Sequence, residues 1–185
     1  MKKYFLFLAV TLMSLTAWAD ADVKTGSLRP LKSASARVLV TWDYANMLIE
    51  DKSPEEFLKE KGEDWEKDYP AEVVAGEAAF KELFNKKDKK YAQITDDSAV
   101  AQYEFVIHVD SFHYGSLGAA IAFGGFARGA HIEGVVDVVD RADGNVIAKI
   151  KFECSGAAAY SNTARRVLAY QDLAKDLAKL VGKAK

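Results

Sequence analysis

Residues 131–154, HIEGVVDVVDRADGNVIAKIKFEC, decide the fold class of this chain. Apolar and polar residues alternate on both sides of Asp143-Gly144, as they do in half-buried strands that are joined by a tight turn. In the first run, Ile132, Val136 and Val138 lie opposite charged residues. The second run alternates lysines with apolar residues up to Cys154. The segment therefore predicts a β-hairpin with one apolar face and one charged face.

Further strands and helices are predicted on both sides of this hairpin. Residues 103–112 (YEFVIHVDSF) alternate in the same way, and residues 37–43 (RVLVTWD) are typical of a strand. Ser53-Pro54 with Glu56 predicts the start of a helix that ends near Lys61. A second helix is expected after Pro70, and a third over residues 163–181, because apolar residues recur there every three or four positions.

These elements predict an α+β fold. Because each late strand has one charged face, the sheet needs cover on only one side. We expect a two-layer sandwich of about four mainly antiparallel strands, with the helices on one face. A length of 185 residues fits one domain, predicted over residues 37–185. Residues 20–36 are polar and are expected to form a flexible leader.

The first residues have the three parts of a secretory signal peptide. Lys2 and Lys3 precede an uncharged apolar run, and Ala17-Trp18-Ala19 has the small-x-small pattern of a cleavage site. The prediction is a signal peptide over residues 1–19, with a retained membrane anchor as the alternative. We expect a soluble protein that is periplasmic or secreted after cleavage.

Composition excludes several classes of function. The formal net charge is −2, with 25 basic and 27 acidic residues, so the basic excess typical of a nucleic-acid-binding protein is absent. The single cysteine, Cys154, excludes an internal disulfide and a multi-cysteine metal site. Neither a G-x-S-x-G motif nor a phosphate-binding glycine motif occurs.

The stretch from residue 107 to 150 resembles uncharacterised secreted and lipoprotein domains of the bacterial envelope. A strand leads into the glycine-rich run 124–130 (GGFARGA), followed by a strand over 135–140 and the Asp143-Gly144 turn. The fold of those domains is similar to the small α/β domains of curli-secretion and Tol-system accessory proteins. The resemblance implies an envelope protein and no catalytic residues.

Residues 114–127 (YGSLGAAIAFGGFA) form an uncharged segment with four glycines. Its large apolar residues are predicted to contact a partner protein, a second copy or a membrane surface: Leu117, Ile121, Phe123 and Phe126. The alternative is a loop that folds over the open end of the core.

A second candidate site is a set of metal ligands on the charged face of the sheet. His108 and Asp110 share a strand face, as do His131 and Glu133, because each pair is two residues apart. If the strands are neighbours, the four side chains suit zinc or another divalent ion. The alternative is a solvated charged face, on which lysines balance the acids.

The leading hypothesis is a non-enzymatic envelope protein that binds another protein or itself and uses no cofactor. The alternative is a zinc-binding protein or a metal-dependent hydrolase. A third possibility is a protein that acts at a membrane surface through the glycine-rich segment.

Overall fold

The predicted hairpin lies near the middle of a seven-stranded sheet. Strands β6 (His131–Asp140) and β7 (Val146–Ser155) pair antiparallel, and β5 (Tyr103–His113) pairs antiparallel with the other side of β6. This computed structural model describes residues 20–87, 89–115 and 129–185. The predicted signal peptide, residues 1–19, lies outside those ranges.

The prediction of about four mainly antiparallel strands is wrong, because the sheet has seven strands and is mixed. Its order is β1-β7-β6-β5-β2-β4, with β3 pairing β5. Strands β2 (Arg37–Asp43) and β3 (Leu48–Ile49) run parallel to β5, and β4 (Gln93–Ile94) runs parallel to β2. A helical crossover between β2 and β5 makes their pairing parallel. The fold is α+β overall.

The first residues of the expected flexible leader, 20–26, form a strand of the sheet. Strand β1 (Asp20–Gly26) pairs antiparallel with β7 and forms one edge. Ala21 and Val23 lie opposite Phe152 and Ile150 of β7, so they extend the apolar face. With only two apolar residues, this strand lacks the alternation that identifies the others. A short 3₁₀ turn follows at Arg29–Leu31.

The described residues also form the α-helices α1 (Pro54–Lys61), α2 (Glu63–Lys87) and α4 (Asn162–Lys183). The first and last match the predicted ranges closely. Helix α2 begins seven residues before Pro70, which it contains. Within the described ranges, none of the helices combines the length and the apolar character needed to cross a bilayer.

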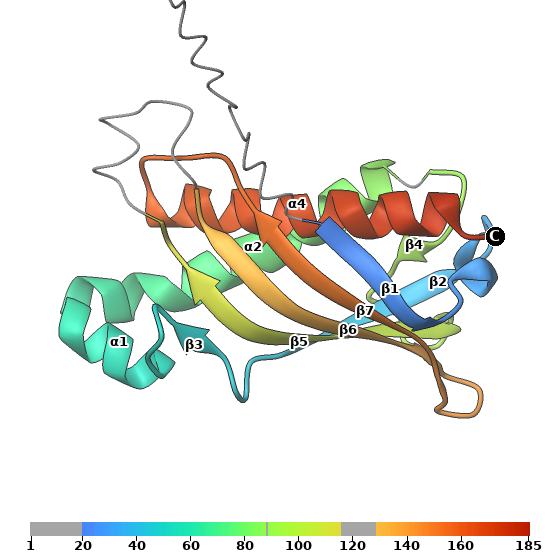
Figure 1. The fold of residues 1–185 in the computed structure, drawn as a ribbon, viewed down its shortest axis with the longest axis horizontal. Helices are drawn as coiled ribbons and strands as arrows, with labels where there is room; N and C mark the ends of the chain where they lie inside the picture. Colours follow the sequence, from blue (N-terminus) through green and yellow to red (C-terminus); the bar gives the residue numbers. More distant parts are fainter. Residues whose placement is uncertain (1–19, 88, 116–128) are drawn as a thin grey trace, which may run out of the picture.

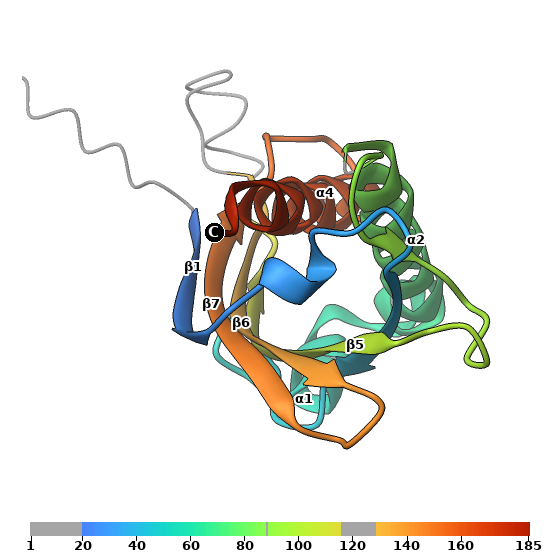
Figure 2. The ribbon, with the colours of Figure 1, turned by 90° about the vertical axis from the view of Figure 1, so that its right-hand side faces the viewer.

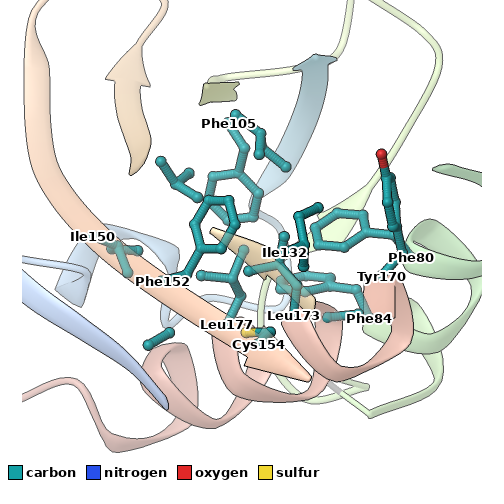
Figure 3. Packing of buried hydrophobic residues seen from close by; sticks show 14 of the residues in the cluster. Phe80, Phe84, Phe105, Ile132, Ile150, Phe152, Cys154, Tyr170, Leu173 and Leu177 are labelled. Carbon is teal, nitrogen blue, oxygen red and sulfur yellow. The ribbon is translucent and has the colours of Figure 1, made fainter. Parts of the chain in front are cut away.

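Helices α2 and α4 lie side by side on the concave side of the sheet (Figures 1 and 2). The core fills the space between the sheet and these helices. Figure 3 shows Phe105, Ile150 and Phe152 of the sheet facing Leu173 and Leu177 of α4. Cys154 lies in the same row as Ile150 and Phe152 and is fully buried, as its spacing predicts.

A capping box holds the start of α1. The Ser53 hydroxyl accepts a hydrogen bond from the Glu56 N–H at 3.2 Å, and the Glu56 carboxylate accepts one from the Ser53 N–H at 3.3 Å. We expect Ser53→Ala to lower the free energy of unfolding, measured with urea, by about 1 kcal/mol. Ser53→Asp keeps an acceptor at the cap and should retain most of that stability. An equal loss in both variants would contradict this role of the cap.

Candidate functional site

Strand β2 is paired along the whole of one side and along only part of the other. Residues 38–43 pair with β5, whereas only Arg37 and Val38 pair with the two-residue strand β4. Among the described residues, no strand pairs with this side of β2 beyond Val38, so it is an open edge there.

The backbone hydrogen bonds show which groups point to the open edge. The Arg37 carbonyl accepts from the Gln102 N–H, next to β5, whereas the Val38 carbonyl accepts from the Thr95 N–H, just past β4. Successive residues of a strand direct these groups to opposite sides. The N–H and C=O groups of Val40 and Trp42 therefore point outward, and none of them has a hydrogen-bond partner among the described residues.

A groove of about 460 Å³ runs between this edge and helix α2. Val40, Trp42 and Phe80 line it, and Phe80 is fully buried. Val74 lies at the rim of the groove, and 64% of it is exposed to solvent, which is unusual for a valine. Lys81 of α2 and Asp96, also in the lining, form an ion pair. We call this region, together with the open edge of β2, the edge groove.

Aromatic contacts hold one end of the edge groove in place. The Trp42 ring packs edge-on against Phe80, with centroids 5.2 Å apart, and stacks on Tyr44 at 6.1 Å. The Tyr44 hydroxyl donates to Glu77 at 2.9 Å and lies 3.0 Å from the Tyr170 hydroxyl. Burial raises the pKa of Tyr44, so its hydroxyl stays protonated. The groove is therefore largely preformed.

The structure separates the predicted metal ligands into two groups. His108 lies beside Val135 of β6, whereas His131 lies beside His113 of β5. A β-bulge between Val109 and Ser111 shifts the register, and Asp110, which lies between them, is exposed. His113 consequently lies on the same face as His108, although simple alternation places it on the opposite face.

His108 belongs to a row of charged side chains on the uncovered face of the sheet. Its Nδ1 lies 2.8 Å from the Asp43 carboxylate, and its Nε2 lies 4.0 Å from that of Asp137. Lys149 donates to both carboxylate oxygens of Asp137 at 2.8 Å. A hydrogen bond from the Ala45 N–H and the contact with His108 hold the pKa of Asp43 below its usual value.

His131 and Glu133 lie together in a separate cluster. The His131 Nε2 is 2.6 Å from Glu133 Oε1 and 3.8 Å from Glu153 Oε1, and its Nδ1 is 2.8 Å from the Ser155 hydroxyl. Glu153 was not among the predicted ligands. Its position near the end of the alternating run 146–154 can be read from the sequence. The strand register that places it opposite Glu133 cannot.

The predicted contact residues Leu117, Ile121, Phe123 and Phe126 lie outside the described residues. Tyr114, the first residue of the uncharged segment 114–127, belongs to a buried polar cluster. Its hydroxyl donates to Glu72 at 2.8 Å and accepts from the Arg166 Nη2 at 2.9 Å. Burial raises the pKa of the Tyr114 hydroxyl, which remains a donor.

Sequence reasoning missed Glu72 and Arg166, although their spacing gives a signal. Glu72 precedes Gly76, Phe80 and Phe84 at intervals of four, so it continues the buried face of α2. Arg166 lies four residues before Tyr170 on the buried face of α4. Because both residues are charged, a prediction from charge alone places them at the surface.

No protein-family model matches the chain, and no curated protein matches it. Among solved structures, the PelC dodecamer from Paraburkholderia phytofirmans is 14% identical, with a TM-score of 0.49, over 86% of this chain and 97% of that chain. A Xanthomonas campestris protein of the DUF330 family is 12% identical, with a TM-score of 0.37, over 80% of this chain and 81% of that chain. Both TM-scores lie below 0.5, so no function is transferred from either protein.

Proposed function

We propose that this chain is a non-enzymatic binding protein of the cell envelope that takes an extended segment of a partner protein into the edge groove. The observation that carries the proposal is the set of outward-pointing backbone groups of Val40 and Trp42 beside a preformed apolar groove. The envelope location rests on the predicted signal peptide and on the resemblance to envelope domains.

The spacing of the free backbone groups favours an extended partner. Val40 and Trp42 offer an N–H and a C=O at every second residue, which is the repeat of a neighbouring strand. A helix uses its own N–H and C=O groups internally and cannot supply this pattern. Strand addition at an open sheet edge is an established mode of peptide recognition.

The side chains that line the groove indicate which residues a bound strand should carry. Trp42 and Val74 present apolar surface on one side of the edge, so a bound strand should carry apolar residues at alternate positions. Residues 39–42 contain neither proline nor lysine, two residues that commonly protect a sheet edge from pairing. The occupant we propose is therefore an extended, alternating apolar segment of another protein.

The test is a phage-displayed library of ten-residue peptides selected on the purified protein. We expect enriched peptides to alternate apolar and polar residues and to slow hydrogen exchange of the Val40 and Trp42 amides when bound. Val74→Asp should weaken their binding at least tenfold, because the groove would then bury an unpaired carboxylate.

Val146→Asp is the matched control, since Val146 is also an exposed valine but lies at the start of β7, away from the groove. It should leave peptide binding unchanged. Equal effects of the two substitutions, or enriched peptides that leave Val40 and Trp42 exchange unaltered, would overturn the proposal. A photo-crosslinker in place of Val74, used in cells, then distinguishes a foreign partner from a second copy.

Contact through Leu117, Ile121, Phe123 and Phe126 stays a separate prediction. Replacing all four by serine tests it. Loss of peptide binding in that variant, with the Val74→Asp variant unaffected, would assign recognition to the glycine-rich segment instead of the edge groove.

A further inference from the structure

Two glutamates face each other directly on the uncovered side of the sheet. Glu133 of β6 pairs with Glu153 of β7, and like charges in such a cross-strand pair repel. Farther along the same two strands, Asp137 pairs with Lys149 and is neutralised by it. In the part of the chain that the structure describes, no lysine or arginine forms an ion pair with Glu133 or Glu153.

His131 lies between the two carboxylates and is held by a fourth residue. Its Nε2 faces both glutamates, at 2.6 and 3.8 Å, and only 17% of its side chain is exposed. The other ring nitrogen, Nδ1, contacts the Ser155 hydroxyl at 2.8 Å. A partner on the second nitrogen is what fixes the orientation of an imidazole that binds a metal.

We propose that His131, Glu133 and Glu153 form a binding site for a divalent cation of the zinc class. One ligand atom from each residue lies within 4.8 Å of the other two, and the two glutamates are partly exposed and can rotate toward a common ion. One imidazole and two carboxylates are ligands that zinc accepts, with the fourth position left to water.

A divalent charge explains the arrangement better than the histidine alone. His131 makes a short contact with Glu133 only, since its Nε2 is 3.8 Å from Glu153. Among the described residues, no lysine or arginine forms an ion pair with the Glu153 carboxylate. An ion bound by both carboxylates removes their repulsion. His113 lies across the strand pair, with its ring centroid 6.3 Å from that of His131, and Glu50 contacts His113 at 3.3 Å. These two residues border the site without belonging to the ligand set.

The experiment titrates zinc into purified, chelator-treated protein by calorimetry, with no peptide present. We expect one zinc per chain, and His131→Ala should lower the affinity at least tenfold. His108→Ala is the matched control, because His108 lies on the same face in contact with Asp43 and Asp137. That variant should bind zinc like the natural sequence.

A second readout separates a metal site from a merely structural cluster. Glu153→Gln removes the repulsion, so it should raise the melting temperature of the metal-free protein while lowering zinc affinity. No zinc binding, or an equal loss in the His108→Ala and His131→Ala variants, would overturn the proposal. Because no partner is involved, this result is independent of the outcome for the edge groove.

Discussion

Replacing Glu72 by alanine is expected to lower the free energy of unfolding by about 3–5 kcal/mol, because it leaves a buried arginine without its counter-charge. Arg166 is fully buried, and its Nε lies 3.8 Å from the Glu72 carboxylate. Its guanidinium sits 4.0 Å from the centroid of the Phe112 ring. Within the described residues, Arg166 Nε and Nη1 have no hydrogen-bond partner, so nothing else there replaces the lost carboxylate.

Chemical denaturation measures this loss, and two further variants show its cause. Glu82→Ala removes an exposed glutamate from the same helix and should change stability by no more than about 0.5 kcal/mol. The double variant Glu72→Leu with Arg166→Leu removes both charges and should be less destabilised than Glu72→Ala. If the double variant were destabilised as much as Glu72→Ala, the unpaired buried charge would not be the reason for the loss.

Gly134→Ala is expected to lower the free energy of unfolding by about 3 kcal/mol, since the added methyl group overlaps backbone atoms. A Cβ at this position would lie 2.0 Å from the His108 carbonyl oxygen and 2.8 Å from Cζ of Phe152. Gly134 pairs with Val109, next to the bulge in β5, and with Phe152 of β7. The central strands must separate to admit the methyl group, and thermal unfolding should occur at a clearly lower temperature.

Gly182→Ala provides the matched control for that substitution. Gly182 lies in α4, and its added Cβ would meet its nearest neighbour, Tyr91, at an ordinary 3.7 Å. Alanine is favoured over glycine inside a helix, so this variant should be as stable as the natural sequence or slightly more stable. A similar loss at both positions would show that steric overlap at Gly134 is not the cause.

The parts of the fold that could be predicted are those with a local signal. Alternation identifies β5, β6 and β7, and the Ser53 cap identifies the start of α1. Strands of two residues, such as Leu48–Ile49, carry no periodic pattern, and β1 carries too few apolar residues to show one. The direction of β2 depends on which strand it meets, and that is decided by packing of the whole chain.

The candidate sites likewise contain some residues that a local sequence pattern identifies and others that only the strand register brings together. His131 and Glu133 could be paired from their spacing, whereas Glu153 joins them only through the register of β6 and β7. His108 could not be separated from them in advance, because the register that places it opposite Val135 does not appear in the pattern. The bulge between Val109 and Ser111, which displaces Asp110, does not appear there either. The open edge of β2 has no sequence signal, since it results from the shortness of β4.

The position of β1 also constrains the order of events during folding. This strand comes first in the described chain, yet its only neighbour in the sheet is β7, which follows almost every other element. Closing so long a loop carries a large entropic cost, and contacts of this kind form slowly. Docking of β1 should therefore be a late step, and until it occurs the edge of β7 is open to pairing with other chains.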